Sequence, residues 1–446
     1  MSKIQNLIFG LTAAQLIAIT FLLAIVFGAC LLEIPSATYQ DISFIDALFT
    51  STSAVCVTGL TVIDTGSSYT HFGQVVILVL IQIGGLGITT YGALFASVLS
   101  GRLTLKQTSV IRDTFAHLGK INFRTLLIDL IVFTLAIELI GALVLFYFIP
   151  HDGFFFALFH AISAFCNAGF SLYNDSFVSY RSSTGVNLML CMLIIAGGIG
   201  FFTVHDIRLK LTGKISRLSL HSRVIIMMTV ILLLGGSILI LILEWSSALN
   251  GMSLHEKILT SFFQATTART AGFNTINLGL FSSSTIFILI ILMFIGASPG
   301  SCAGGVKTST IAVLLSFFKS RIQGREDVFL FKRTIPSDNV TKAISVATAS
   351  SLVIVFMFFI FLSVEGWDNS YTSSPHTFTD ALFEVVSAYG TVGLSLGATP
   401  KLSVFGKIFI IVTMFIGRVG PLVLALAVGG EKQLKYKYAE ERVMVG

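Results

Sequence analysis

Apolar stretches recur along the whole chain, and each is long enough to cross a lipid bilayer as a helix, which takes about 20 residues. Eight such spans can be read from the sequence, at residues 13–32, 74–99, 125–149, 186–204, 224–243, 284–318, 343–364 and 404–428. Only 11% of the residues are charged, whereas a soluble globular chain has about 25%. We therefore predict an all-α membrane protein with eight transmembrane helices. A soluble enzyme, a nucleic-acid-binding protein and a disordered scaffold are excluded.

Positive charge is concentrated in one set of connections. The shorter loops after the second, fourth and sixth spans, the C-terminal tail and Lys3 together hold 21 of the 28 Lys and Arg residues. Because cytoplasmic loops have the excess of positive charge, we expect a multi-pass protein of the cell membrane with both termini in the cytoplasm. The five cysteines are scattered without metal-ligand spacing, so neither a disulfide framework nor a metal site built from them is predicted.

The four longer connections, which then face outward, repeat one motif. They include residues 47–61, 157–171, 260–274 and 381–395. Their in-phase glycines are Gly59, Gly169, Gly272 and Gly393. A second glycine column follows 24 to 28 residues later, at Gly84, Gly197, Gly296 and Gly417. Repeats of this kind indicate equivalent structural units. Each unit is a span, a pore loop and a span, and the predicted boundaries are 1–124, 125–223, 224–342 and 343–446.

Each outward segment contains a Phe-containing stretch of about ten residues, which is too short to cross a bilayer. It suits a half-helix that enters the membrane and turns back at the glycine, where a Cβ would hinder the backbone. The expected starts are capping patterns at Ser43 with Asp46, Ser253 with Glu256, and Thr377 with Asp380. Four such turns around one axis would direct peptide carbonyls at a common centre, where they can replace the hydration shell of a cation.

The fourth segment reads Thr391-Val392-Gly393-Leu394, which is similar to the start of the T-V-G-Y-G filter of potassium channels. With four in-phase copies, the whole chain resembles the Trk/Ktr/HKT superfamily of potassium transporters, and within it the membrane subunit of bacterial Ktr systems. The resemblance implies a pseudo-fourfold pore that transports K⁺, with some Na⁺ involvement. It also implies a homodimer in the lipid membrane and a cytoplasmic ring of nucleotide-binding RCK-type regulatory subunits. It implies no cofactor in this chain.

By the same resemblance, each repeat supplies one strand of the K⁺ filter. The strands are Val57, Thr58 and Gly59; Asn167, Ala168 and Gly169; Thr270, Ala271 and Gly272; and Thr391, Val392 and Gly393. No copy has the full five-residue signature, and only the fourth has Val before the glycine. We therefore expect fewer or looser outer ion sites than in a strict potassium channel, with correspondingly weaker selectivity.

The sixth span is interrupted by small and helix-breaking residues between Gly296 and Thr310. Glycine costs about 1 kcal/mol and proline about 3 kcal/mol in a helix interior. The resemblance places this break below the filter as a movable intramembrane loop, a gate; a simple packing kink is the alternative. The expected gate residues are Gly296, Ser298, Pro299, Gly300, Gly304, Gly305, Lys307 and Arg418.

Two arginines lie at positions where a buried charge costs free energy. Arg418 is in the middle of the eighth span, where a charge needs a cavity or a partner. Below a cation filter it would be an electrostatic barrier or an anchor for the gate loop; a structural pair with Asp129 or Glu138 is the alternative. Arg269 directly precedes the third filter strand, and we expect a nearby acid to neutralise it.

These features favour K⁺ uptake driven by the membrane potential, since 100 mV is worth about 2.3 kcal/mol per monovalent cation. The chain has no P-loop and no dinucleotide-binding fingerprint, so regulation is expected from the partner subunits. An alternating-access cation symporter is the alternative, although such transporters often use inverted repeats and several broken helices. The sequence has neither a zinc-protease motif nor a nucleophile elbow, so an enzyme is not predicted.

Overall fold

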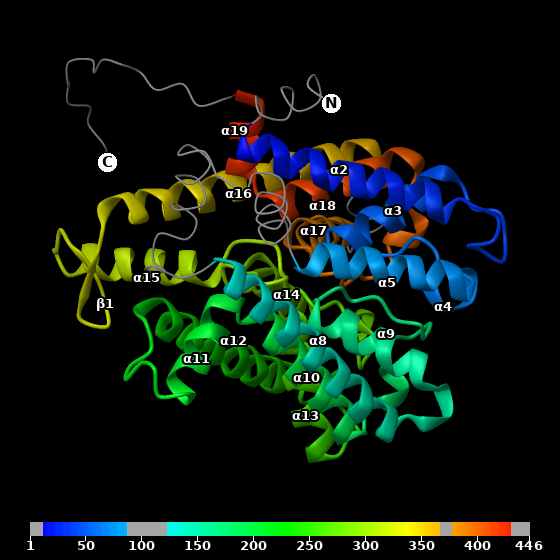
Figure 1. The fold of residues 1–446 in the computed structure, drawn as a ribbon, viewed down its shortest axis with the longest axis horizontal. Helices are drawn as coiled ribbons and strands as arrows, with labels where there is room; N and C mark the ends of the chain where they lie inside the picture. The colour runs from blue at the N-terminus through cyan, green and yellow to red at the C-terminus, as the bar shows by residue number, and fades with distance from the viewer. Residues whose placement is uncertain (1–11, 87–122, 366–376, 430–446) are drawn as a thin grey trace.

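The computed structural model describes residues 12–86, 123–365 and 377–429 (Figure 1). The α-helices are α2 (Ala13–Leu32), α3 (Phe44–Val55), α4 (Thr65–Ser68), α5 (His71–Leu86), α8 (Phe123–Phe148), α9 (Phe154–Phe165), α10 (Thr184–Gly198), α11 (Phe201–Leu211), α12 (Leu220–Glu244), α13 (Leu254–Thr267), α14 (Ser283–Phe294), α15 (Thr308–Ile322), α16 (Ser337–Val364), α17 (Thr377–Gly390), α18 (Val404–Val419) and α19 (Pro421–Gly429). The two strands are β1 (Val328–Leu330) and β2 (Arg333–Ile335). The chain is thus predominantly helical, as predicted.

Within the described ranges, four helices are long and apolar enough to cross a membrane: α2, α8, α12 and α16. The number rises to six if each of two sharply bent helix pairs is counted as one span. Helix α5 occupies the start of the predicted second span, whose remainder lies outside the described residues. The sixth predicted span is divided into α14 and α15.

The fourth and eighth predicted spans are not continuous helices, and this part of the prediction was wrong. Helix α10 meets α11 at 99°, and α18 meets α19 at 94°. The bends occur at Gly200 and Gly420, whose φ values are 89° and 92°. A left-handed residue ends an α-helix, and glycine adopts that conformation without a Cβ clash. Pro421 then starts α19, at the position where proline is favoured.

Four short helices, α3, α9, α13 and α17, are embedded among the longer ones. Each short helix contacts a helix that follows another short helix: α5 contacts α9, α10 contacts α13, α14 contacts α17, and α18 contacts α3. Because the last of these pairs leads back to the first short helix, the contacts form a closed cycle. The first and last described helices, α2 and α19, also lie side by side (Figure 1). The Gln15 side-chain amide donates a hydrogen bond to the Ala427 carbonyl oxygen there, at 3.0 Å.

Two of the short helices, α3 and α13, start at side-chain caps. Ser43 Oγ accepts a hydrogen bond from the Asp46 backbone N–H at the start of α3. Ser253 and Glu256 form a reciprocal capping box at the start of α13. These two predicted starts are confirmed. The capping partners satisfy N–H groups that the first helical turn leaves without partners.

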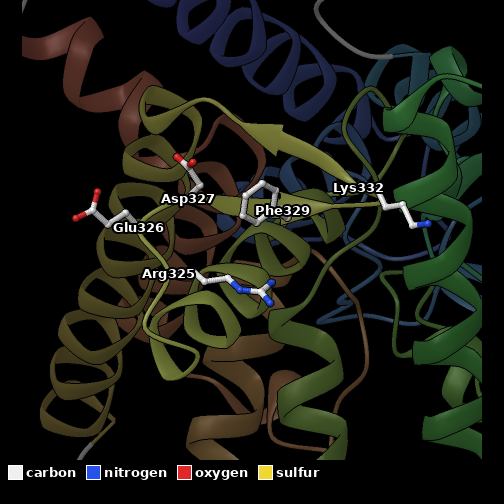
Figure 2. Close-up of a pocket in the computed structure, with 5 residues that line it drawn as sticks. All are labelled: Arg325, Glu326, Asp327, Phe329 and Lys332. Atoms are coloured by element: carbon white, nitrogen blue, oxygen red, sulfur yellow. The ribbon is translucent and has the colours of Figure 1, made fainter.

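A β-hairpin connects α15 with α16. Phe331 and Lys332 have φ values of 50° and 61°, which is the backbone geometry of a two-residue hairpin turn. The Arg223 guanidinium of α12 lies 5.3 Å from the centre of the Phe331 ring. Beside the hairpin is an open hollow of about 650 Å³, shown in Figure 2. It is lined by Arg325, Glu326, Asp327, Phe329 and Lys332, and none of these is a predicted site residue.

Candidate functional site

The four in-phase glycines lie against one another. A Cβ placed on Gly59 would be 2.5 Å from the Ala168 carbonyl oxygen and 2.9 Å from Gly169 Cα. One placed on Gly169 would be 2.8 Å from the Ala271 carbonyl oxygen. Real Cβ atoms do not approach other heavy atoms so closely. The first segment therefore borders the second, and the second borders the third.

The third segment borders the fourth in the same way, and the fourth borders the first. A Cβ on Gly272 would be 2.6 Å from the Val392 carbonyl oxygen, and one on Gly393 would overlap the Thr58 carbonyl oxygen. Each glycine thus faces a carbonyl group of the next segment, and the fourth faces the first. The result is a closed ring of four backbone segments, and any side chain at these positions would obstruct it.

The backbone conformation is also shared by the four segments. The residue two positions before each glycine has a positive φ: 56° at Val57, 58° at Asn167, 72° at Thr270 and 51° at Thr391. The glycines have φ values between 71° and 91°. A left-handed non-glycine residue costs about 1–2 kcal/mol, so its occurrence at one position in all four segments indicates a common requirement. When residues with negative and positive φ alternate along a strand, successive peptide groups turn toward the same side of it.

The strand N–H groups are occupied by the short helices behind them. Thr58, Ala168 and Val392 each donate from N–H to the carbonyl of the residue five positions earlier, at 2.7–2.8 Å. In the third segment Ala271 N–H donates to the Thr267 carbonyl at 2.9 Å, one residue closer. These N–H groups point back into protein, and the carbonyl oxygens of Thr58, Ala168, Ala271 and Val392 lie beside the glycine of the neighbouring segment. Within the described ranges, no cluster of His, Cys, Asp and Glu could hold a metal ion instead.

A polar side chain nine residues before the glycine anchors three of the segments from behind. Thr50 Oγ1 accepts a hydrogen bond from the Tyr69 hydroxyl at 3.0 Å. His160 Nε2 accepts from the Leu172 N–H at 3.2 Å and lies 3.1 Å from Ser171 Oγ. These contacts tie each short helix to the chain that leaves its glycine.

The fourth and third segments differ in this position. Glu384 accepts hydrogen bonds from the hydroxyls of Ser395 and Thr399. The third segment has Phe263, which cannot form such a bond. Its chain is held by the second segment instead, since the Asn274 carbonyl accepts from the Phe177 N–H at 2.8 Å. Sequence reasoning missed this position; aligning the four segments column by column would have revealed it.

The second glycine column explains how closely the helices pack. A Cβ on Gly84, Gly197 or Gly417 would overlap a backbone carbonyl oxygen. The carbonyls belong to Val55, Phe165 and Tyr389, respectively, and each of these residues lies four positions before a ring glycine. These carbonyls lie at the ends of α3, α9 and α17. In the third repeat, Gly296 packs against the Gly304 carbonyl oxygen. Glycine is needed there because backbone meets backbone directly.

The expected break in the sixth span occupies residues 295–307, between α14 and α15. Its Gly304 N–H donates to Thr391 Oγ1 at 3.1 Å, so the loop touches the fourth ring segment. It also contacts the junction of α10 and α11, where Ser298 N–H donates to the Gly198 carbonyl and Phe201 N–H donates to the Gly300 carbonyl. The loop therefore lies directly against the ring.

The loop also receives the side chain of Arg418. Its guanidinium donates hydrogen bonds to the carbonyl oxygens of Cys302 and Gly84. Glu138, proposed as an alternative partner, instead accepts from the Gln82 amide and the Cys166 thiol, and the Asp129 side chain lies outside the described part of the structure. Lys307 Nζ donates to the Ala303 carbonyl of the loop. These contacts correspond to the anchoring interpretation of Arg418.

The expectation for Arg269 was wrong. Its guanidinium is buried and bonds to Thr229 Oγ1 at 3.4 Å, and its Nε has no protein partner. Within the described ranges, no carboxylate forms an ion pair with it. The cation lies just beyond the C-terminal end of α13, where the partial negative charge of the helix offsets part of its charge.

A helical membrane protein in which four backbone turns converge on one ring belongs with the proteins that move ions across membranes. This chain is a member of the TrkH family of cation transport proteins, whose family model matches residues 11–433. It is therefore an ion transporter and not an enzyme.

Known proteins are similar over nearly the whole chain. The Ktr system potassium uptake protein B of Bacillus subtilis is 39% identical, with 98% of this chain and 97% of that protein aligned. The protein of the same name from Vibrio alginolyticus is 36% identical, over 97% and 94%. The potassium/sodium uptake protein NtpJ of Enterococcus hirae is 38% identical, over 98% of each chain.

The fold has a counterpart among crystal structures. The potassium transporter TrkH from Vibrio parahaemolyticus superposes with a TM-score of 0.71 at 19% identity. The match covers 94% of this chain and 85% of that one. At this identity the likeness establishes the fold alone.

Proposed function

We propose that the protein takes up K⁺ across the cell membrane through a filter formed by the four ring segments. The observation that supports this most strongly is the closed ring, in which each glycine faces a carbonyl oxygen of the next segment. Backbone carbonyls that converge on a common centre can replace the hydration shell of a K⁺ ion. The names of the relatives support K⁺ as the transported ion. No cofactor in this chain is needed for the step.

The proposed architecture is four span–pore loop–span units around a pseudo-fourfold axis, divided at the boundaries 1–124, 125–223, 224–342 and 343–446. The cyclic contacts from α5 to α9 through α18 to α3 support it. In this arrangement the sixth span consists of α14 and α15, the fourth of the bent pair α10 and α11, and the eighth of the bent pair α18 and α19. The basic connections then face the cytoplasm together with both termini.

The gate is the loop of residues 295–307. Its hydrogen bond to Thr391 and its contacts with Arg418 support a position across the ion path, directly below the filter. Arg418 would add a positive charge that opposes cation passage while it anchors the loop. Movement of the loop away from Thr391 would open the path.

The partners are proposed from the relatives. Two of them are named as proteins of a Ktr system, which supports a partner subunit. That the partners are cytoplasmic RCK-type nucleotide-binding subunits, and that this chain assembles as a homodimer, is proposed from the resemblance to the superfamily alone. A third is named for potassium and sodium, which supports Na⁺ dependence or Na⁺ passage. The absence of a Val before three of the four glycines supports a looser selectivity.

Alternating access by a cation symporter is the second candidate, and the structure gives one observation in its favour. Three of the predicted spans are broken, at Gly200, at Gly420 and over residues 295–307, and broken helices occur in such transporters. The ring favours the filter instead, because a site formed by four equivalent backbone turns does not need to open alternately.

Rb⁺ uptake into proteoliposomes at an inside-negative potential, with and without Na⁺, tests the proposal. Gly393→Ser places a side chain against the Thr58 carbonyl and should abolish selective Rb⁺ uptake. Gly397→Ser is the matched control, because Gly397 has a similar positive φ, 95° against 88°, but nothing within 4 Å of its Cβ position. Uptake that is equal in Gly393→Ser and wild type would exclude a filter at this ring.

A further inference from the structure

The side chain of Asn167 differs in kind from its counterparts in the ring. Two positions before their glycines the four segments have Val57, Asn167, Thr270 and Thr391, all with positive φ. Valine and threonine are β-branched and adopt this conformation at a cost, whereas asparagine is one of the residues other than glycine that tolerate it. The asparagine side chain also ends in an amide, which has two donors and an acceptor.

The Asn167 amide is buried against two helices, α9 and α10. A Cβ on Gly197 would be 3.3 Å from one of its terminal atoms, and a Cβ on Gly198 would be 3.4 Å from the other. With its nitrogen toward the carbonyl oxygens of Ala164 and Ile194, the amide donates to both, at 3.0 and 3.1 Å. The reverse orientation would place the amide oxygen against these two oxygens, with no hydrogen between them. The amide nitrogen therefore ties the second ring segment to the helices behind it.

The amide oxygen of Asn167 then faces the third segment. It lies 3.4 Å from Thr270 Oγ1, so the Thr270 hydroxyl donates to it. The two residues are 103 positions apart. The backbones of their segments are in contact as well, since a Cβ on Gly169 would be 2.8 Å from the Ala271 carbonyl oxygen. One side chain thus connects the second strand with a short helix, a longer helix and the neighbouring strand.

We propose that Asn167 is a specificity-determining residue, which holds the second and third filter strands at the separation that K⁺ requires. This inference rests on the proposed function. Na⁺ is smaller than K⁺, so carbonyl oxygens replace its hydration water only if they move closer together. A strand whose buried hydrogen bonds are satisfied on three sides resists that movement, because such a network rigidifies the groups that it joins. Asn167 acts by positioning the strand, and its side chain does not contact the ion.

The test measures the ratio of Rb⁺ to Na⁺ uptake into proteoliposomes. Asn167→Val removes the amide and introduces the residue of the first segment, Val57, whose φ is 56° against 58°. We expect the ratio to fall about tenfold, which corresponds to the free energy of about one buried hydrogen bond. A ratio equal to that of wild type would overturn the proposal, because a merely structural residue changes the uptake of both ions together.

Asn187→Val is the matched control. Asn187 and Asn167 are both 1% exposed. The amide nitrogen of Asn187 donates to three backbone carbonyls, those of Tyr180, Arg181 and Ser183. Asn187 precedes Gly197 by ten residues on α10, which is about 15 Å along the helix. Asn187→Val should lower the melting temperature and leave the uptake ratio unchanged. An equal fall of the ratio in both asparagine variants would overturn the proposal, since loss of stability would then explain it.

Thr270 variants keep the test decisive if Asn167→Val does not fold. Thr270→Val keeps the shape of the side chain and removes the hydroxyl that faces Asn167, so the ratio should fall about threefold. Thr270→Ser retains a hydroxyl and should lose less; a ratio that is lower in Thr270→Ser than in Thr270→Val would overturn the proposal. If Gly393→Ser leaves uptake intact, the filter proposal itself fails. If Gly393→Ser abolishes uptake while Asn167→Val keeps the wild-type ratio, this inference alone fails.

Discussion

The hydroxyl of Thr391 accepts a hydrogen bond from the backbone N–H of Gly304 at 3.1 Å. Thr391 is a ring residue of the fourth segment, and Gly304 belongs to the loop that interrupts the sixth span. The two residues are 87 positions apart, so the contact joins the proposed filter and the proposed gate directly. If the loop closes the proposed ion path, the strength of this one hydrogen bond bears on how easily the loop moves away from Thr391.

Thr391→Val is expected to loosen the loop. Valine keeps the shape of threonine but cannot accept the Gly304 hydrogen bond, and a buried N–H without a partner costs about 1–3 kcal/mol. Rb⁺ uptake by the purified chain without regulatory subunits should therefore increase. Thr391→Ser keeps the acceptor and should behave as wild type. A decrease or no change in Thr391→Val would contradict the role of this contact in closure.

Arg418→Ala should raise ion flux. The variant removes both the positive charge beside the proposed ion path and the two hydrogen bonds through which Arg418 links Cys302 of the loop to Gly84 of α5. Single-turnover Rb⁺ efflux or electrical recording would measure the change. Arg418→Lys keeps the charge and should show a smaller increase. Unchanged flux in Arg418→Ala would rule out both the barrier and the anchor.

Gly197→Ala is expected to destabilise the protein. The new methyl group would overlap the Phe165 carbonyl oxygen at the end of α9, and overpacking of this kind costs about 1–3 kcal/mol. Gly235→Ala is the matched control, since nothing lies within 4 Å of its Cβ position and alanine favours a helix by about 1 kcal/mol. Thermal unfolding in detergent should separate the two variants; equal melting temperatures would contradict the close helix packing.

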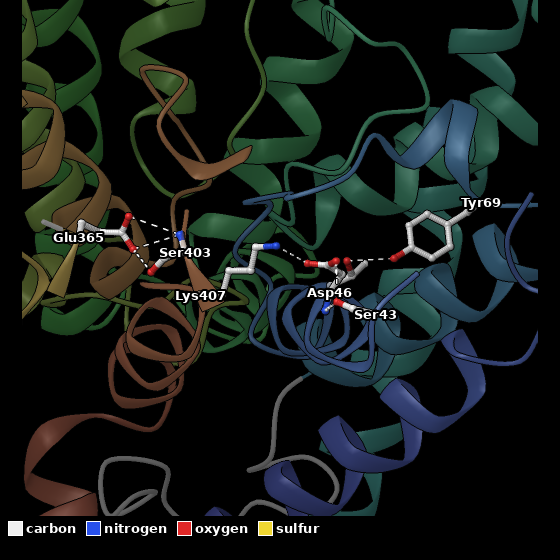
Figure 3. Close-up of polar contacts among 7 residues, drawn as sticks. Ser43, Asp46, Tyr69, Glu365, Ser403 and Lys407 are labelled. Atoms are coloured by element: carbon white, nitrogen blue, oxygen red, sulfur yellow. Dashed lines mark hydrogen bonds and ion pairs between the residues drawn. The ribbon is translucent and has the colours of Figure 1, made fainter. Parts of the chain in front are cut away.

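Lys407 and Asp46 connect α18 with α3, and Figure 3 shows their ion pair, with Nζ and Oδ1 2.6 Å apart. Both side chains are about five-sixths buried, with 16% and 17% exposed. Lys407→Met should destabilise the protein by about 1–3 kcal/mol, less than the about 3–5 kcal/mol for a fully buried pair. Asp46→Asn in the same chain should restore part of the loss. Strictly additive effects in this double-mutant cycle would show that the pair contributes nothing.

The sequence predicts the helical membrane class and the four glycine positions because both follow from local constraints. Long apolar runs have few alternatives to a spanning helix, and Gly59 with its counterparts marks places where only backbone fits. The bends at Gly200 and Gly420 were missed because apolar residues continue through them. The pairing of Lys407 with Asp46 joins residues 361 positions apart, and the neutral surroundings of Arg269 depend on packing against α12; neither leaves a local pattern.

The ion position itself gives the most direct test of the account. Crystals of the protein grown in Rb⁺ and measured at the rubidium absorption edge should show anomalous density on the axis enclosed by Gly59, Gly169, Gly272 and Gly393. The same protein preparation must transport Rb⁺ in proteoliposomes. Anomalous density at that centre is the predicted result. A transport-competent protein whose rubidium peaks all lie away from the four glycines would contradict the claim that their backbone oxygens bind the ion.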